Sequence, residues 1–516
     1  MATFLRPGIY VDETLDAISN PVVQSPGEAI AAFVGAHNFG PAVPTLITSW
    51  SQFQLVYGGW GNGTNLLPYA VYSYFANGGA KAYVCRAVPS DSVASTVTLN
   101  DRQAPAEATL KFTAKAAGAF GNKLYIDVTD ANTGTGRFNL AIKVGGTTDA
   151  YIADRYNDVS LDPADTRNLV AMVNSPVNGS AFVKVDYVTV DPYSSVIAPA
   201  VQTATPLTGG TDGVAAPDLV AATKHLEDTG EIVNVNLPGI SDTTVLNSVI
   251  TWAEDYGYAF VVVDVPSTPS GDAATALTAY GKLSPASNTG TSPAPLKASS
   301  YVGVYGPWLV SADPASVAPG ATRLLPPGGA VLGKYSEVDV QFGPHQAAAG
   351  TLSKIAGVYS TELKFSNSQL DTLNAWGINA IRQLPQAGIC IMGARTQKSG
   401  YPDRYIPVRR LLTHVRKILV DITRSAVFAP NTPDLWHSIA ANVTQQLTTM
   451  AQAGMFATAT PDTAFAVICD DSNNTPSTVD NGEVHIDVGL AVARPAEFVA
   501  LHISQYDGGT AVAENA

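Results

Sequence analysis

Five short apolar segments, separated by helical patterns, place the strongest constraint on how this chain folds. They are AIAAFVGA (29–36), KAYVCRAV (81–88), EIVNVNL (231–237), YAFVVVDV (258–265) and the segment 300–305. Apolar runs of this length, bounded by turn residues, are typical of strands buried on both faces of a parallel sheet. Because helical patterns lie between them, we expect an α/β core built from βαβ units.

The chain is too long for one hydrophobic core, and its composition changes along its length. Its 516 residues predict three or four folded units. Between about residues 90 and 206 it is rich in Ala, Thr, Val, Asn and Gly, and short strand patterns such as NKLYIDVTD (122–130) indicate an inserted all-β module. After residue 366, a strand pair at 379–384 and 388–394 followed by long helices and closing strands predicts an α+β unit.

These patterns divide the chain into parts with different expected structures. We predict an N-terminal arm (1–22), a discontinuous α/β core (23–90 and 207–365), an inserted β-rich outer domain (91–206), an α+β C-terminal domain (366–504) and a C-terminal tail (505–516). Within the C-terminal domain the helices are expected at 408–427 and 432–453, and the closing strands at 464–469, 483–491 and 497–504.

Both ends of the chain have the pattern of extended segments with little core of their own. Pro7 and Gly8 break any helix, and the residues that follow alternate at strand period, as do those of 497–504. An extended arm satisfies its backbone groups best by joining a sheet edge, here an edge on a neighbouring copy. The candidate inter-subunit residues are Pro7, Gly8, Ile9, Tyr10, Val11, Phe498, Val499, Leu501 and Ile503.

Charge and cysteine content exclude several classes of protein. The net charge is −14, from 29 basic and 43 acidic residues, so no overall positive field exists to bind nucleic acid. Only 14% of the residues are charged, which suggests that other copies cover much of the surface. The three cysteines are too far apart for a disulfide framework, and the sequence has neither a signal peptide nor an apolar run of ~20 residues. We expect a soluble chain made without export.

Three motifs resemble known sites, and each lacks an essential part. GGAVLGKYS (328–336) has the glycines and lysine of a phosphate-binding loop, but Tyr335 stands where a magnesium-binding hydroxyl is needed, so a plain Gly-rich turn is expected. Asp228, His345 and Ser353 follow the chain order of a subtilisin-like triad without the context that acyl transfer needs. The scattered histidines and the 470–474 run lack metal-binding spacing. We predict no catalytic residue, no metal and no cofactor.

One segment carries an unusual positive charge. Between Trp376 and Pro430, nine basic residues are opposed by two acidic ones, a net of +7 inside a chain of −14. On the helix expected at 408–427, polar residues recur every three or four positions and form one stripe opposite an apolar stripe. This concentration favours a partner surface that is locally negative. The candidate contact residues are Arg409, Arg410, Arg416, Lys417 and Arg424.

Several motifs in the same order resemble contractile tail sheath proteins of bacteriophages and of related injection systems. PGIYVDE (7–13) resembles the opening arm of that family, and FANGGAKAYVCRAV (75–88) is similar to part of its first conserved block. LTGGTDG (207–213) resembles the point where the family's core resumes after a variable insertion. The clearest likeness lies in NAIRQLPQAGICIMGARTQ (379–397), RYIPVRRLL (404–412), AVFAPNTPDLW (426–436) and VARPAEFVALHI (492–503).

The resemblance implies a structural protein, with a core similar to a subtilisin-like fold that lacks catalysis. It implies stacked hexameric rings around an inner tail tube, in a metastable extended state whose contraction drives the tube through a target envelope. The implied partners are other copies, the tube protein, and baseplate and tail terminator proteins, with no nucleic acid and no membrane insertion. The C-terminal domain and its basic helix would lie next to the tube. The chain would be made in the bacterial cytoplasm and built into a virion tail or an injection particle.

A function from another class stays open at this point. The same α/β core would suit a non-assembling hydrolase-like enzyme or a carbohydrate-binding surface protein. The sequence does not distinguish a phage that ejects DNA from a genome-free injection device.

Overall fold

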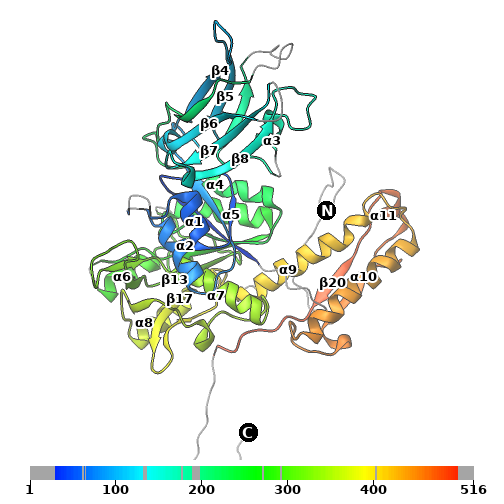
Figure 1. The fold of residues 1–516 in the computed structure, drawn as a ribbon. Coiled ribbons are helices and arrows are strands. Elements are labelled where there is room, and N and C mark those ends of the chain that lie inside the picture. The colour runs from blue at the N-terminus through cyan, green and yellow to red at the C-terminus, as the bar shows by residue number, and fades with distance from the viewer. Residues whose placement is uncertain are drawn as a thin grey trace, which may run out of the picture.

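The computed structural model describes residues 29–497, apart from 61–62, 64, 132–135, 176–177, 189–197, 270–271, 291–292 and 401–403. A mixed eight-stranded sheet forms the centre of the molecule (Figure 1). Its strands, from edge to edge, are β18 (Gly388–Met392), β17 (Ile378–Leu384), β13 (Val302–Gly306), β12 (Ala259–Asp264), β11 (Val233–Asn236), β1 (Ile30–Ala36), β3 (Ala82–Ala87) and β2 (Thr45–Ile47). The strands from β17 to β3 run parallel, and β18 and β2 pair antiparallel at the edges.

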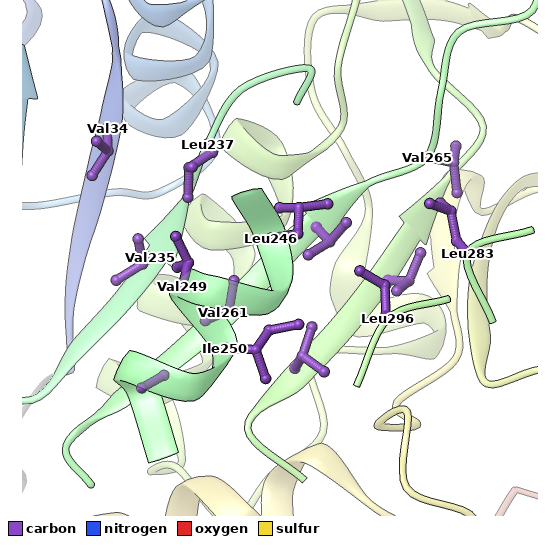
Figure 2. Close-up of a cluster of buried hydrophobic side chains, with 14 of the residues drawn as sticks. Val34, Val235, Leu237, Leu246, Val249, Ile250, Val261, Val265, Leu283 and Leu296 are labelled. Atoms are coloured by element: carbon purple, nitrogen blue, oxygen red, sulfur yellow. The ribbon is translucent and has the colours of Figure 1, made fainter. Parts of the chain in front are cut away.

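Helices cover both faces of this sheet, as the apolar strand patterns predict. Neighbouring strand residues face opposite sides, so that Val262 packs under one helical layer and Val261 under the other. Figure 2 shows Val249 and Ile250 of α5 beside Val235 and Val261 of the sheet. One layer contains α1 (Trp50–Tyr57), α2 (Leu67–Ala76) and α7 (Gly328–Gln341), and the other contains α4 (Leu219–Lys224), α5 (Thr243–Tyr256), α6 (Ala273–Gly281) and α8 (Asn367–Ala375).

The α/β core extends further along the chain than the predicted boundary at residue 366. The strand pair that we assigned to the C-terminal domain is β17 and β18, and β17 joins the central sheet beside β13. Leu373 of α8 is buried in the same core. The boundary is therefore corrected to the segment before residue 406. Sequence pattern alone does not show which sheet an antiparallel pair joins.

The Gly-rich segment 328–336 is a buried helix and not the turn that we predicted. Gly329 and Gly333 lie four residues apart on α7 and face α2, where a Cβ atom would come within 2.3 Å of the Ala70 carbonyl oxygen and 2.7 Å of the Tyr74 carbonyl oxygen. The glycines therefore allow two helices to touch backbone to backbone. Burial of this close contact outweighs the low helix propensity of glycine.

Two smaller β structures accompany the core. Strands β15 (Thr322–Leu325), β14 (Leu309–Ala312) and β16 (Val358–Thr361) form a three-stranded sheet within the core segment. The inserted module has its own hydrophobic core between two antiparallel sheets. Its elements are β4 (Thr96–Asn100), β5 (Ala108–Ala114), β6 (Leu124–Asp130), β7 (Phe138–Val144), β8 (Ile152–Val159), α3 (Leu169–Val173), β9 (Val183–Tyr187) and β10 (Gln202–Pro206).

Arg86 at the end of β3 ties the inserted module to the core. Its side chain is buried, and its guanidinium donates hydrogen bonds to main-chain oxygens on both sides of the junction, those of His37, Gly40 and Ala117. Phe39 from the core also lies against Phe120 of the module, with ring centroids 4.1 Å apart. The module is therefore fastened to the core through side chains as well as through the chain itself.

The C-terminal lobe stands to one side of the core and is joined to it by one long helix and by the segment that returns to the core after β20 (Figure 1). Helix α9 runs from the core into the lobe, where Leu411 and Val415 pack against Ile439 and Val443 of α10. The elements of the lobe are α9 (Ile406–Thr423), α10 (Pro433–Gln452), β19 (Phe465–Ile468), α11 (Pro476–Asp480) and β20 (Asp487–Leu490). The two predicted helices and the first two predicted closing strands are present in that order. Helix α11 between the strands was not predicted, and the third predicted strand, 497–504, lies outside the described residues except for Glu497.

Candidate functional site

Two of the three residues that echo a catalytic triad, Asp228 and Ser353, are engaged in other interactions. Asp228 lies at the surface with its carboxylate 4.0 Å from the imidazole of His225. Ser353 is buried, and its hydroxyl donates to the Gly350 carbonyl at 2.8 Å and accepts the Ile391 N–H at 3.0 Å. The Ser353 hydroxyl therefore links the main chain of β18 to the turn that begins at Gly350. Burial lowers the pKa of His345, which keeps that imidazole neutral.

The crevice where doubly wound sheets bind ligands is filled by the chain's own residues. Strand order reverses between β1 and β11, and ligands of such folds bind beyond the carboxyl ends of the strands at this point. Here Gly239, after β11, lies under Leu66 and Trp308, so that even a Cβ atom would come within 2.4 Å of Leu66. The side chains of Asn236 and Asp264 occupy the strand ends.

Asp264 is a buried carboxylate that joins two strands to a helix. One oxygen accepts the N–H of Gly328, the first residue of α7, at 2.6 Å. The other accepts the N–H of Gly239 at 3.0 Å and the side-chain amide of Asn236 at 3.1 Å. Burial raises the pKa of Asp264 to about 6, although these three hydrogen bonds act in the opposite direction. The group positions the start of α7 and leaves no room for a ligand.

The first half of α9 is buried in the core, together with two of the predicted contact arginines. Arg409 and Arg410 are only 4% and 5% exposed. Arg410 donates to the carboxylate of Asp339 on α7, and both side chains are buried. Its guanidinium also lies 4.3 Å from the ring centre of Tyr335. The structure thus removes Arg409 and Arg410 from the expected partner surface and makes them the anchor of α9.

The other predicted basic residues lie along the outer part of α9. Arg416 sits 5.5 Å from the ring centre of Tyr258, at the turn before β12. Lys417 and Arg424 both approach the carboxylate of Asp421, at 3.2 and 2.9 Å. The Arg424 side chain is 70% exposed. Lys417 and Arg424 therefore remain as the surface part of the predicted basic stripe.

The predicted inter-subunit arm residues lie outside the described residues. This holds for Pro7, Gly8, Ile9, Tyr10, Val11, Phe498, Val499, Leu501 and Ile503. Glu497 is the last described residue, and its carboxylate forms a bidentate ion pair with Arg395. Its Oε1 accepts from Nε of Arg395 at 2.9 Å, and its Oε2 accepts from Nη2 at 2.5 Å. Arg395 also donates to the Asn374 carbonyl at 2.9 Å. The root of the C-terminal arm is therefore fixed to the core and not to the C-terminal lobe.

The described part of the chain has neither a metal-binding cluster nor a membrane-spanning helix. There, no three His, Cys, Asp or Glu side chains gather in a way that could hold a metal ion. The same part contains no helix with the length and apolar character needed to cross a bilayer. The three cysteines, Cys85, Cys390 and Cys469, are free and buried.

Sequence reasoning missed the acidic partners of the basic segment. Asp339 and Glu497 each pair with an arginine that is 71 or 102 residues away, and no local pattern signals such a pairing. Asp264 did carry a signal, since it is the one charged residue within the apolar run YAFVVVDV, where a charge needs buried partners.

Removing one partner of the Arg410–Asp339 pair should destabilise the chain strongly. We expect Asp339→Asn or Arg410→Met to lower the free energy of unfolding by about 3–5 kcal/mol, because each removes one charge of a buried ion pair. The double variant Asp339→Leu, Arg410→Met should recover most of this loss. Denaturant unfolding measures all three, and Lys417→Met, which breaks an exposed pair, should change stability by less than about 1 kcal/mol. Equal losses in the single and double variants would contradict the pairing.

Deprotonation of Asp264 should lower the free energy of unfolding as pH rises. Because burial raises the pKa of Asp264 from its ordinary value of 3.8 to about 6, the folded chain holds this proton more tightly than the unfolded chain does. Its contribution is fully present below pH about 4 and is lost as pH rises through about 6, a change on the order of 3 kcal/mol. The difference in unfolding free energy between the wild type and Asp264→Asn should follow this course. Asp272→Asn is the control: hydrogen bonds from Thr275 lower the pKa of Asp272, so its difference should stay flat in this window.

Comparisons with known proteins agree on one kind of assembly. No family model matches the chain. A tail sheath protein of Vibrio phage KVP40 is 26% identical over 183 residues, which is 35% of this chain and 26% of that protein, so the match spans about a quarter of the relative.

Solved structures match over almost the whole chain. The helical sheath of the anti-feeding prophage in its contracted state is 20% identical, with a TM-score of 0.56, and covers 98% of this chain and 100% of that one. The contracted sheath complex of PVC, an extracellular contractile injection system, is 19% identical, with a TM-score of 0.55 and coverage of 98% and 99%. A sheath tail protein from Listeria innocua is 13% identical, with a TM-score of 0.56 and coverage of 92% and 96%. The resemblance to contractile tail sheath proteins is confirmed, and the chain has the fold of these sheath proteins.

Proposed function

We propose that this chain is the sheath subunit of a contractile tail or injection particle. In this function it polymerises as stacked hexameric rings around an inner tail tube. The polymer is assembled in a metastable extended state, and its contraction drives the tube through a target envelope. The tube, baseplate and tail terminator proteins are the proposed partners, and the bacterial cytoplasm is the proposed place of synthesis.

The observation that carries this proposal is likeness of fold over the whole chain. The match covers 98% of the residues in two sheaths that are named as contracted, so it includes the core, the inserted module and the C-terminal lobe together. An enzyme that shared only the α/β core would match over that part alone. The filled crevice at the reversal of strand order gives this chain's core a supporting role that suits a structural subunit.

The fold also supports a mechanism in which subunits change neighbours without unfolding. Contraction of a polymer can proceed by rigid-body rotation and sliding of its subunits. In this chain the core and the lobe share α9, whose first half is buried beside Asp339 and whose second half packs on α10. A force on the lobe would therefore reach the core through a continuous helix.

We propose that the terminal arms connect these moving bodies by joining sheets on neighbouring copies. The strand pair β19–β20 supports this, because within the described residues it forms a two-stranded sheet of its own. A sheet of this size leaves backbone groups on its outer edges available to another strand. Each added backbone hydrogen bond contributes about 0.5–1.5 kcal/mol, so an arm of five bonds would hold a neighbour firmly.

We further propose that the core is related to subtilisin-like folds and does not share their chemistry. Its parallel strands with helices on both faces suit this relationship, as does the chain order of Asp228, His345 and Ser353. The main-chain hydrogen bonds of Ser353 give that residue a structural use in place of a nucleophilic one.

Electron microscopy of the purified chain tests the proposed function. The full-length chain should form striated hollow cylinders. A variant that lacks residues 1–16 should unfold at nearly the same temperature and remain a soluble monomer, because it loses the arm and keeps the core. Hydrolysis or glycan binding by a stable full-length monomer would contradict the proposal. Ordinary cylinders from the truncated chain would show that the N-terminal arm is not a joint.

We propose that the exposed part of α9 faces the tube. Lys417 and Arg424 stand on one side of the helix and share a single acidic neighbour, Asp421. Exposed charge contacts contribute about 0–1 kcal/mol each, so many subunits acting together could hold the tube and still release it.

Charge reversal at the surface of α9 tests this orientation. The double variant Lys417→Glu, Arg424→Glu should fold normally and still form sheath polymers without a tube, but assemble poorly on the tube. Lys224→Glu, Lys282→Glu is the matched control, since both side chains are exposed on the core, away from α9. Co-sedimentation with tubes measures the effect. Normal tube binding by the α9 variant would refute the proposal that α9 faces the tube.

A further inference from the structure

After β20 the chain leaves the C-terminal lobe and returns to the core by a path separate from α9 (Figure 1). Its last contacts in the lobe are those of Ala491, whose N–H donates to the Ala464 carbonyl at 2.9 Å, and of Val492, which packs against the apolar core of the lobe. At Glu497 the chain already lies on the core. Residues 493–497, here called the strap, therefore connect the lobe to the core at the base of the C-terminal arm.

The arginine that receives Glu497 is held in place by the core itself. The main chain of Arg395 exchanges two hydrogen bonds with the buried side-chain amide of Asn379 on β17, at 2.7 and 2.9 Å. Arg395 also forms a β-bridge with Tyr405, the residue before α9. Its guanidinium donates to the Asn374 carbonyl at 2.9 Å, in the last turn of α8, where the helix end favours a cation. The core therefore presents a fixed receptor to the strap.

The contact between Glu497 and Arg395 constrains direction as well as distance. Both carboxylate oxygens of Glu497 accept from the guanidinium, and a bidentate pair of this kind forms in one relative orientation. The two side chains are each only 14% exposed, so water competes little for these hydrogen bonds. By comparison, the surface pair of Lys184 and Asp186 leaves about half of each side chain exposed. The pair therefore fixes the end of the strap on the core.

We propose that the Arg395–Glu497 pair is a latch that sets the point on the core from which the C-terminal arm reaches a second copy. This rests on the proposed function, in which the arms join neighbouring copies, and it names the residues that direct this arm. With the latch closed, the arm starts from Glu497 on the core. With the latch open, it starts from Val492 in the lobe, and the strap adds up to about 17 Å of slack. A longer free tether lowers the effective concentration of the arm at the sheet edge that it joins.

Distance measurement in the soluble chain tests the latch itself. Spin labels at Ser248→Cys on α5 and Ala496→Cys on the strap should give one narrow distribution; both positions are exposed, and the native cysteines are buried. Glu497→Gln, which keeps the size of the side chain and removes its charge, should broaden this distribution, and Glu497→Lys should broaden it further. Glu254→Gln is the matched control, because it makes the same change at an ion pair on α5 and should have no effect. An unchanged distribution in both Glu497 variants would overturn the latch.

Polymerisation tests what the latch does. Glu497→Gln and Arg395→Met should each raise the critical concentration for polymerisation by about threefold or more, and the double variant should be no worse than either one. The distance between labels at Ser248→Cys and Gln445→Cys on α10 should stay narrow in all three, because α9 holds the lobe independently. Normal polymerisation by a variant whose Ala496 distance is broadened would overturn the role in directing the arm. A latch that opens as expected in a chain whose wild type never polymerises would support the latch and contradict the proposed function.

Discussion

The buried ion pair between Arg410 and Asp339 decides how the two halves of this molecule are joined. Helix α9 begins in the core and ends in the C-terminal lobe, so its seating on α7 determines where the lobe stands. Burying two charges is costly, and a pair of this kind contributes little net stability compared with apolar residues of the same size. The pair instead constrains the orientation of α9, because the guanidinium must approach the carboxylate in one geometry. We infer that the pair fixes the angle at which α9 leaves the core.

The same principle operates at the end of the central sheet. Asp264 accepts the first N–H of α7, and α7 in turn carries Asp339. The N-terminus of a helix favours a negative group, which is the geometry that α/β proteins often use to bind anions. In this chain the anion is part of the protein. The Asp264 carboxylate occupies the position that a bound anion takes in those proteins. It holds α7 in place, and α7 contacts α9 through Asp339 and α2 through its glycines.

The sequence contained enough to predict the elements and their order, because buried strands and amphipathic helices follow local periodicity. The α/β core, the inserted β module, and the two long helices and first two closing strands of the C-terminal lobe could be predicted in this way, whereas the short helix α11 was missed. Properties that depend on distant partners could not. Part of the positive surplus of the segment 376–430 is balanced by Asp339 and Glu497, which lie outside it. For the same reason, Arg409 and Arg410 were predicted to be surface contact residues although they are buried, and the glycines of α7 were predicted to form a turn.

The central claim is that the core and the C-terminal lobe behave as one rigid body held by α9. Distance measurement between spin labels at Ser248→Cys on α5 and Gln445→Cys on α10 tests it most directly, since both positions are exposed and the native cysteines are buried. The account predicts one narrow distance distribution, the same in the soluble subunit and in the assembled polymer, which broadens when Asp339→Asn is added. A broad distribution in the wild-type subunit, or a different distance in the polymer, would contradict it.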